Sequence, residues 1–298
     1  MRTRRPRRSC HSIPVTNARM VDKGAGLAAD MVFLDMEDSV PVHQRGARAQ
    51  ALAQEALQRS YRAATLGVRV NAVDGPWCLD DLTAMVDAPV PPDVVLVPKI
   101  NDATEVAYVC HLLDALERRR GRSGPPIGVE LLIETATAMA TVGAIAAAAP
   151  ERVESLVFGP GDFAASIDAP QPTIGALPAP GAPDPQEHAL FALVLAGRAH
   201  GLQVIDGPYG VLDDPDGLRR SVVRSRSLGC DGKWSIHPSQ IPVLNEMFGA
   251  TEAEIARARQ IIDALDGVGA ARMGNEMVDV ATRGLAEATL RRAGMDAG

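Results

Sequence analysis

The chain has 298 residues, enough for one large α/β domain or two small ones with a substantial core. Its formal net charge of −7 argues against nucleic acid as a main partner, because binding to phosphate backbones needs a basic surface. Apolar residues make up 46% of the chain but aromatic residues only 3%. Small aliphatic side chains must therefore fill the core, which is typical of parallel strands covered by helices.

Arginines crowd the N-terminus, at Arg2, Arg4, Arg5, Arg7 and Arg8. We expect residues 1–8 to form a solvated basic tail, since a charge run is usually exposed. A targeting signal is the alternative, but no apolar segment follows the arginines. The four cysteines match no zinc spacing and are typical of reduced thiols. The longest apolar stretch, residues 136–150, is too short to span a bilayer, so we expect a cytoplasmic protein without a membrane partner.

Short apolar runs alternate with helical segments along most of the chain. The predicted strands are residues 10–14, 31–35, 67–71, 94–98, 127–133, 155–159, 202–206 and 233–236. The clearest predicted helices are residues 44–59, 103–119, 136–148, 187–200 and 215–228. Eight buried strands alternating with helices predict an α/β fold, a (β/α)₈ TIM barrel. An open doubly wound sheet is the alternative, but no glycine-rich dinucleotide fingerprint follows the first strand.

The rest of the chain predicts a loop and an appendage. Residues 169–184 are rich in Pro, Gly and Ala, which predicts a long loop of the kind that acts as a lid or an interface. After the eighth strand we expect two helices, residues 252–265 and 276–292, with a hinge at residues 267–269. We therefore divide the chain into a basic tail (1–8), a barrel (9–250) and a C-terminal helical extension (251–298).

Charged or polar residues recur where the predicted strands end. The active site of a TIM barrel lies at the C-terminal ends of its strands, so these side chains should converge. They are Asp35, Glu37, Asp38, Arg69, Asn71, Lys99, Glu134, Asp162, Asp206 and His237. Any one of them can be an ordinary surface charge, but the repetition predicts an active site.

Two of these carboxylates favour a metal ion. Glu134 and Asp162 end neighbouring predicted strands, so they can converge on one ion. Hard oxygen ligands select Mg²⁺, or Mn²⁺, over zinc, and Mg²⁺ takes only one or two protein carboxylates while keeping positions for water or substrate oxygens. Arg69 is permanently charged and planar, which suits it to bind a carboxylate or a developing oxyanion.

From Arg8 to Arg292 the chain resembles the HpcH/HpaI aldolase/citrate lyase superfamily, and within it the citrate lyase β-subunit/malyl-CoA lyase group. The matching segments are Arg8-Ser9 with Pro14 and Lys23, residues 35–38, 69–71, 97–99, 132–135, 158–159 with Asp162, 206–207, 232–241 and 277–279. Each segment is weak evidence alone, but their order on these strand ends is specific.

The resemblance implies a magnesium-dependent carbon–carbon lyase. Such an enzyme cleaves, or forms by Claisen condensation, a 3-hydroxyacyl-CoA such as malyl-, β-methylmalyl- or citramalyl-CoA, with a 2-oxo acid and acetyl- or propionyl-CoA as the other partners. Glu134 and Asp162 resemble the metal ligands, with Glu134 beside the substrate, and Arg69 resembles the residue that binds the oxygen of the cleaved bond. Asp279 resembles the acid or base of a C-terminal lid that reaches a neighbouring subunit's site, which implies a homotrimer or hexamer.

The resemblance also implies which residues bind the coenzyme A part of the thioester. Arg19 and Lys23 align with basic residues that contact the phosphates of coenzyme A. The backbone around Ile236 and His237 is similar to the segment that lines the adenine or pantetheine side. We do not expect His237 to act as a base.

The remaining charged positions resemble supporting groups. Glu37 and Asp38 are similar to acids that hold metal-bound waters and Arg69, and Lys99 is expected to brace the carboxylate cluster. Asp206 is either part of this site or a salt-bridge partner at the rim.

The chain departs from the family pattern at Val15, Gly161 and Ser166, where glycine, an acidic residue and aspartate are common. These changes leave the metal ligands in place, but they do not determine which acyl group the enzyme prefers. Three alternative functions also stay open: a citrate lyase subunit acting on an acyl-carrier-protein thioester, a malyl-CoA thioesterase on the same scaffold, and a barrel that binds CoA esters without catalysis.

Overall fold

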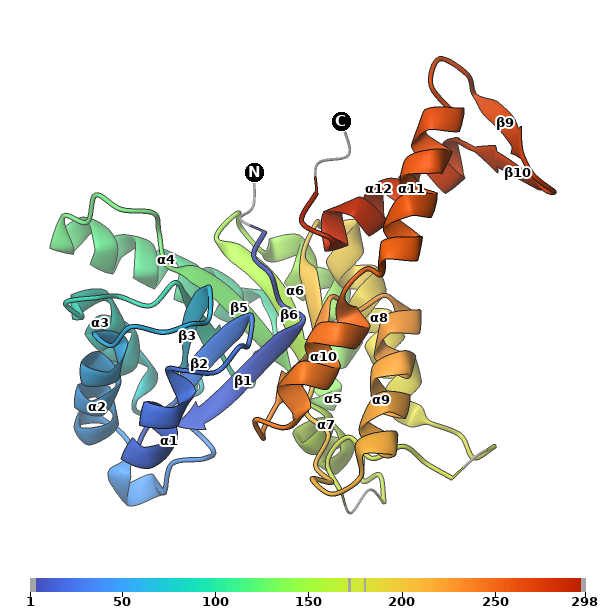
Figure 1. Ribbon diagram of the computed structural model, residues 1–298. Coiled ribbons are helices and arrows are strands. Elements are labelled where there is room, and N and C mark those ends of the chain that lie inside the picture. Colours follow the sequence, from blue (N-terminus) through green and yellow to red (C-terminus); the bar gives the residue numbers. More distant parts are fainter. Residues whose placement is uncertain (1–3, 171–172, 180, 296–298) are drawn as a thin grey trace. The chain divides into compact units, whose positions relative to one another are not determined.

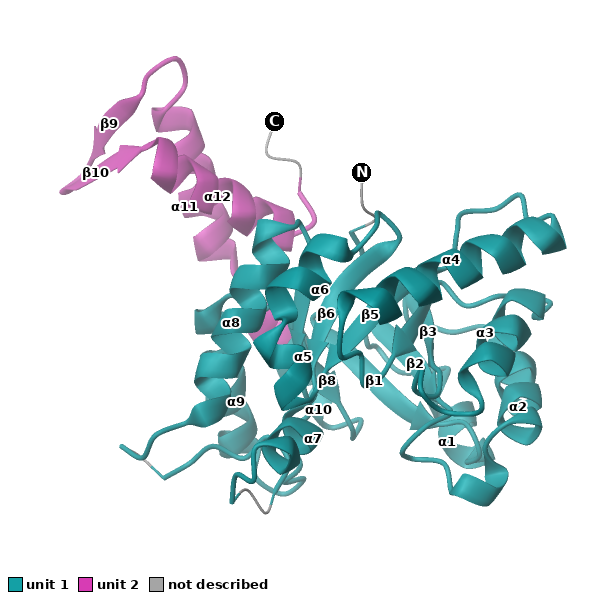
Figure 2. Ribbon diagram, turned by 180° about the vertical axis from the view of Figure 1, so that it is seen from behind, with its two compact units in different colours: residues 1–245 teal, residues 246–298 magenta. Residues whose placement is uncertain are grey.

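The computed structural model describes residues 4–170, 173–179 and 181–295 (Figure 1). The chain divides into two compact units, residues 1–245 and residues 246–298 (Figure 2). No helix in the described ranges has the length and apolar character needed to cross a membrane.

The first unit contains a closed barrel of eight parallel strands in sequence order. The strands are β1 (Ser9–Pro14), β2 (Met31–Asp35), β3 (Thr65–Arg69), β4 (Val94–Val97), β5 (Gly128–Ile133), β6 (Val153–Phe158), β7 (Gln203–Asp206) and β8 (Gly232–Ser235). Pairing of β1 with β8, in the register Ser9 to Lys233, closes the ring. The predicted TIM barrel is confirmed, and each predicted strand corresponds to an observed one, with ends shifted by up to two residues.

Helices lie between the strands and surround the barrel (Figure 1). They are α1 (Ala18–Gly24), the 3₁₀ helix η1 (Val42–Gln44), α2 (Ala47–Leu57), α3 (Cys78–Asp87), α4 (Ala103–Arg120), α5 (Ala136–Ala140), α6 (Val142–Ala148), α7 (Pro160–Ser166), α8 (Pro185–Ala199), α9 (Pro215–Leu228) and α10 (Gln240–Phe248). Four helices, α1, α3, α7 and α10, were not predicted from the sequence, because helices of seven to ten residues carry little periodic signal. The helix predicted over residues 136–148 is two helices that meet at Thr141.

The middle of the barrel interior is an apolar layer. It is formed by Cys10, Met31, Phe33, Val94, Leu96, Leu132, Val157, Ile205 and Trp234. The rings of Phe33 and Trp234 meet edge to face with centroids 4.8 Å apart. Gly67 makes room for its neighbours, since an added Cβ there would lie 2.5 Å from Met31 Cε. This layer separates the two ends of the barrel, and residues two positions apart on one strand, such as Met31 and Phe33, both face the interior.

Arg7 fills the N-terminal end of the barrel. Its side chain is fully buried, with Nε 2.7 Å from Glu130 and Nη2 3.0 Å from Glu154. These two glutamates belong to β5 and β6, so an arginine from before β1 joins the far side of the ring. The expected solvated tail is therefore wrong at Arg7, because two buried carboxylates need a positive charge there.

The neighbouring arginines also have partners. Arg5 is half-buried beside Glu154 at 3.2 Å, and Arg8 binds Asp30 at 2.7 Å. Arg4 is 52% exposed in its side chain, and lies 3.2 Å from an aspartate of the β7–β8 connection. The expectation of a solvated tail thus fails for residues 5, 7 and 8, while Arg2 lies outside the described residues.

The described part of the predicted loop, residues 169–184, forms turns without a helix or strand. Its Ile174 carbonyl accepts a hydrogen bond of 2.8 Å from Gly210 N. Gly175, with φ of +66°, packs so closely on Pro208 that an added Cβ would lie 2.1 Å from the Pro208 carbonyl oxygen. The loop is thereby attached to the connection that follows β7.

The second unit contains a helix, a hairpin and a helix. These are α11 (Glu252–Ala264), β9 (Ala270–Met273), antiparallel β10 (Glu276–Asp279) and α12 (Val280–Arg292). Its core is formed by Ala258, Ile261, Leu265, Val278, Ala286 and Leu290. The prediction of a helix from residue 276 is wrong for its first four residues, which pair with β9. The two-residue turn begins at Gly274 with φ of +62°, and such a Gly-Asn pair is a hairpin signal in the sequence.

Candidate active site

The charged side chains of the site gather at the C-terminal ends of neighbouring strands. Asp35 ends β2 and Arg69 ends β3, while Lys99 and Glu134 follow β4 and β5. Asp35 is the Cα partner of Arg69 across the two strands, on the interior side that also carries Phe33. The parallel barrel thus brings together residues up to a hundred positions apart in the sequence.

Arg69 is fixed by carboxylates on one side and an aromatic ring on another. Its Nε and Nη2 donate to Asp35 at 2.8 and 2.6 Å, and its Nη1 lies 3.1 Å from Glu37. The guanidinium carbon lies 5.1 Å from the centroid of the Trp234 ring. Burial alone would lower the pKa of Arg69, but the attraction of Asp35, followed by Glu37 and Asp38, raises it above its ordinary value. The result is a permanent, rigidly held positive charge.

Asp35 orients Arg69, whereas from the sequence it was expected in the cluster without a particular role. Burial acts to raise the pKa of Asp35, but the adjacent Arg69 outweighs it and holds the pKa below its usual range. The sequence of β2 does indicate where Asp35 points. Asp35 lies two and four positions after Phe33 and Met31, so all three side chains face the barrel interior.

Lys99 joins two parts of the cluster. Its backbone N–H donates to Glu134 Oε1 at 2.8 Å, while its ammonium pairs with Glu37 and lies 3.3 Å from Asp38. Its φ of 55° is left-handed, which costs a non-glycine residue about 1–2 kcal/mol. Burial alone would lower the pKa of Lys99, but its hydrogen bond to Glu37 and the surrounding carboxylates raise it.

Glu134 is buried close to a second carboxylate. Burial first, and then repulsion from Asp162, raise the pKa of Glu134 to about 8. Gly159, after β6, gives it space, because an added Cβ there would lie 2.4 Å from Glu134 Cβ. Asp162 is exposed on the first turn of α7. Arg69 and Lys99 lower the pKa of Glu134 by less than burial and Asp162 raise it, and a divalent cation bound to the two carboxylates would offset their repulsion.

The donor set of this pair suits a hard ion. In residues 4–170, 173–179 and 181–295, no group of three or more His, Cys, Asp or Glu side chains is arranged to hold a metal. Zinc sites normally need three or four such ligands. Two carboxylates with open positions for water or substrate oxygens fit Mg²⁺ or Mn²⁺ instead.

The residues expected on the thioester side lie on the same end of the barrel but make no contact with the carboxylates. Arg19 and Lys23 are exposed, one helical turn apart on α1, which follows β1. Ile236 follows β8, and its side chain packs on the apolar layer. His237 is exposed, and its Nδ1 lies 2.8 Å from Ser239 Oγ in a local turn.

Asp279 lies in the second unit, at the junction of β10 and α12, and is exposed. Its carboxylate caps α12 by accepting from Ala281 N at 3.0 Å and Thr282 N at 3.1 Å. The hydrogen bond from the Thr282 backbone is the largest cause of the lowered pKa of Asp279. The carboxylate is therefore held in its charged form at the start of a helix.

Asp206 belongs to the layer between barrel and helices. It is fully buried, 2.5 Å from Lys233 Nζ and 3.7 Å from Arg224 on α9, and it also accepts from Ser225. From the sequence, Asp206 was expected either in the active-site cluster or in a salt bridge at the rim, and this buried network is neither. Asp206 instead ties β7, β8 and α9 together.

The departures from the family pattern have local explanations. Val15 N donates to Asp35 O at 3.1 Å, which extends the pairing of β1 with β2. Ser166 Oγ accepts from Ala136 N at 2.9 Å and so links the end of α7 to the start of α5. At Gly161, an added Cβ would lie 3.3 Å from Ile174 Cγ1.

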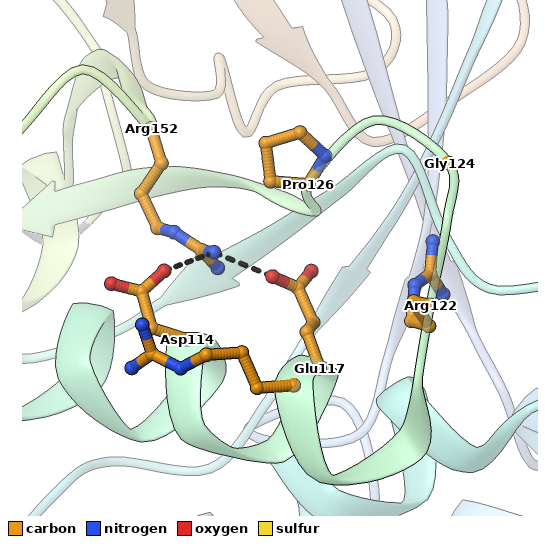
Figure 3. A pocket seen from close by; sticks show the side chains of 7 residues that line it. Asp114, Glu117, Arg122, Gly124, Pro126 and Arg152 are labelled. Carbon is orange, nitrogen blue, oxygen red and sulfur yellow. Dashed lines mark hydrogen bonds and ion pairs between the residues drawn. The ribbon is translucent and has the colours of Figure 1, made fainter.

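A cavity of about 230 Å³ lies at the opposite end of the barrel (Figure 3). It is lined by Asp114, Glu117, Arg118, Arg122, Gly124, Pro126 and Arg152. Arg152 directly precedes β6, and its Nη2 lies 2.5 Å from Asp114 and 2.6 Å from Glu117 (Figure 3). Because it lies at the N-terminal ends of the strands, the cavity is separate from the candidate active site.

Two protein-family models together match most of the chain. The model of the HpcH/HpaI aldolase/citrate lyase family matches residues 8–238, and that of the C-C bond lyases of the TIM-barrel fold matches residues 192–296.

Individual relatives match along nearly the whole chain. An L-malyl-CoA/beta-methylmalyl-CoA lyase of Cereibacter sphaeroides is 35% identical, covering 98% of this chain and 96% of the relative. A (3S)-malyl-CoA thioesterase of the same species is 34% identical over 92% of this chain and 88% of the relative. The crystal structure of CitE from Mycobacterium tuberculosis in complex with magnesium, acetoacetate and coenzyme A superposes with a TM-score of 0.73, at 27% identity, covering 96% of this chain and 97% of that one.

Proposed function

The chain belongs to the HpcH/HpaI aldolase/citrate lyase family, and we propose that it is a magnesium-dependent carbon–carbon lyase acting on CoA thioesters. It cleaves, or forms, a 3-hydroxyacyl-CoA of the malyl, β-methylmalyl or citramalyl type, with a 2-oxo acid and acetyl- or propionyl-CoA as the other partners. The observation that carries the proposal is the placement of the Asp35-bound Arg69 in one cluster with Glu134, beside Asp162.

Glu134 and Asp162 are the proposed ligands of Mg²⁺, or of Mn²⁺ in its place. A bound ion would offset the repulsion that raises the pKa of Glu134. When bound, it supplies Lewis acidity at the carboxylate and hydroxyl oxygens of the substrate. The complex of CitE with magnesium supports this choice of metal.

Arg69 is the proposed partner of the oxygen whose bonding changes. Cleavage removes the proton of the substrate hydroxyl group, which passes to solvent, and turns the hydroxyl carbon into the carbonyl of the 2-oxo acid. The electron pair of the broken carbon–carbon bond passes to the carbon next to the thioester, which takes up a proton. Two of the five N–H groups of Arg69 go to Asp35 and Nη1 also lies 3.1 Å from Glu37, which leaves N–H groups that can donate to that oxygen. Because Asp35 and Trp234 already fix the guanidinium, it needs no reorientation during the reaction.

Asp279 is the proposed acid or base at the carbon next to the thioester. It protonates that carbon in cleavage and removes the proton in condensation. We propose that residues 251–298 form a lid over a neighbouring subunit's site in a homotrimer or hexamer. Exposed apolar side chains on both sides of Asp279, Met277 at 74% and Val280 at 71%, support contact with another protein surface.

Coenzyme A is the proposed carrier of the acyl group. Arg19 and Lys23 are exposed cations on α1, where they are available to bind its phosphates. The backbone at Ile236 and His237 is the proposed lining for the pantetheine or adenine part. The CoA-ester lyase relatives and the CitE complex with coenzyme A support this assignment.

A panel of substrates tests the proposal. The purified protein is incubated with Mg²⁺ and malyl-, β-methylmalyl-, citramalyl- or citryl-CoA, and 2-oxo acid and free thiol are followed separately. A lyase releases 2-oxo acid without free thiol, and Glu134→Gln should abolish that release. Free thiol without 2-oxo acid would instead establish the second candidate, a thioesterase, which the 34% identical thioesterase relative favours. Absence of both products would overturn the proposal in favour of an acyl-carrier-protein substrate or of binding without catalysis.

A further inference from the structure

Lys99 has an unusual backbone conformation at the edge of the cluster. Among the described residues, Lys99 and Asp168 are the non-glycine residues with left-handed φ, 55° and 54°. Left-handed backbone is unfavourable for residues with a Cβ, and glycine adopts it without that penalty. A strained backbone persists only where its surroundings hold it, and such strain often occurs at functional sites.

The main chain of Lys99 connects two loops. Its N–H donates to Glu134 Oε1 at 2.8 Å, and its carbonyl accepts from Asn101 Nδ2 at 2.9 Å. Asn101 Oδ1 in turn accepts from the hydroxyl of Thr135, the residue after Glu134, at 2.6 Å. Two of these three bonds join the β4–α4 and β5–α5 loops, the third lies within the β4–α4 loop, and together they can hold the strained backbone in place.

The side chain of Lys99 reaches the opposite part of the cluster. Its ammonium pairs with Glu37 and lies 3.3 Å from Asp38. Glu37 also lies 3.1 Å from Arg69 Nη1. One residue therefore touches both a proposed metal ligand and the acids around the proposed oxyanion-binding arginine.

We propose that Lys99 is a positioning residue with two separable functions. Its left-handed main chain sets the orientation of Glu134 for the metal ion, and its ammonium holds Glu37 and Asp38 in place beside Arg69. This inference rests on the proposed metal-dependent lyase function and adds a residue that acts through others.

Two variants separate the functions. Lys99→Gly keeps the left-handed backbone and removes the ammonium, whereas Lys99→Val removes the ammonium and disfavours the backbone. Because both lack the charge, comparing them isolates the main chain. Mn²⁺ affinity, measured by electron paramagnetic resonance of the free ion, should be at least tenfold weaker in Lys99→Val than in Lys99→Gly. At saturating Mn²⁺, Lys99→Gly should still lose at least tenfold in kcat, with recovery in Lys99→Arg.

Asp168 provides the matched control. It is exposed and left-handed, so Asp168→Val and Asp168→Gly repeat the backbone change away from the cluster. Their thermal stabilities should differ while their Mn²⁺ affinities agree within about twofold. If Lys99→Val does not fold, Lys99→Ala replaces it as the variant with a smaller backbone penalty.

Each outcome bears on the inference. Equal Mn²⁺ affinities in the Lys99→Gly and Lys99→Val proteins would overturn the main-chain function, and an unchanged kcat in Lys99→Gly would overturn the side-chain function. A wild-type protein that binds Mn²⁺ without lyase activity would refute the proposed function, while a difference between the two variants would still support the positioning of Glu134. A wild-type protein that binds no Mn²⁺ would overturn both.

Discussion

The carboxylate of Asp35 holds the guanidinium of Arg69 through two hydrogen bonds of 2.8 and 2.6 Å. The two residues are register partners on the adjacent strands β2 and β3, and both are buried. A paired, two-point contact fixes the plane of the guanidinium as well as its position. The direction in which Arg69 offers its remaining N–H groups is therefore set before any substrate arrives.

We predict that Asp35→Asn lowers both stability and kcat. The amide offers one acceptor oxygen and places an N–H₂ group against the guanidinium, so a buried ion pair is broken, at a cost of about 3 kcal/mol. The kcat should fall at least tenfold, with a smaller change in KM, because Arg69 is no longer held. Urea unfolding and steady-state kinetics provide the two measurements. The exposed Asp80→Asn on α3 is the matched control, and a normal kcat in Asp35→Asn would contradict the role of Asp35.

The barrel was predictable because its strands are local patterns. Residues 94–97 and 128–133 are almost unbroken apolar runs, and each leads into a polar or charged residue at the strand end. Buried parallel strands require such runs, and the right-handed strand–helix–strand connections follow from the alternation with helices. The convergence of Arg69, Lys99 and Glu134 then follows from the fold, without any knowledge of their contacts.

What the sequence did not predict depends on distant partners or single backbone angles. Arg7 reads as one more member of an arginine run, and its partner Glu130 is 123 positions away. Nothing in the sequence around Lys99 indicates a left-handed φ, because lysine rarely adopts one. The four residues of β10 are too few for a period-two pattern to stand out from the helix that follows.

The buried ion pairs of Arg7 at the N-terminal end of the barrel should affect stability and not catalysis. Arg7→Met leaves Glu130 and Glu154 buried without their main counter-charge, and it should lower the free energy of unfolding by about 3–5 kcal/mol. The kcat should not change, because the apolar layer separates Arg7 from the other end of the barrel. Chemical denaturation and kinetics at a temperature where the variant is folded provide the test.

Two further variants serve as a control and as a partial rescue of Arg7→Met. Arg4→Met removes an arginine that is 52% exposed, so it should change stability by no more than about 1 kcal/mol. Adding Glu130→Gln to Arg7→Met should recover part of the lost stability, because it removes one unpaired charge. An Arg7→Met protein as stable as the wild type would mean that the buried network contributes nothing net.

Asp279 allows its proposed chemistry to be separated from its structural role. Asparagine caps helices about as well as aspartate, so Asp279→Asn should keep α12 and leave stability nearly unchanged. The same variant cannot exchange a proton, and turnover should fall at least a hundredfold while substrate binding persists. Asp279→Ala, the control for the cap, should lose stability as well. Near-normal turnover in Asp279→Asn would remove Asp279 from the mechanism.

We expect the stability of the fold to depend on pH through the buried side chain of His11. It is buried, with Nδ1 3.0 Å from Ser235 Oγ, and burial first, then repulsion from His237, lower its pKa to about 4. An unfolded chain has a histidine pKa of about 6.5, so between these values the unfolded state binds more protons than the folded state. Stability from the neutral ring is therefore present above pH 6.5 and is lost as the pH falls towards 4. Between pH 7 and 5 the loss from this one residue should be about 2 kcal/mol.

The substitution His11→Asn tests this dependence, because a neutral amide can keep a polar contact with Ser235 without taking up a proton. The variant should be less stable than the wild type at pH 7 because it packs less well, but its stability should fall about 2 kcal/mol less between pH 7 and pH 5. Urea midpoints at four pH values within that range measure the slope. His43→Asn changes an exposed histidine and should leave the slope as it is in the wild type. Parallel slopes for wild type and His11→Asn would show that His11 is not buried in its neutral form, because only a histidine that resists protonation in the folded state can produce the difference.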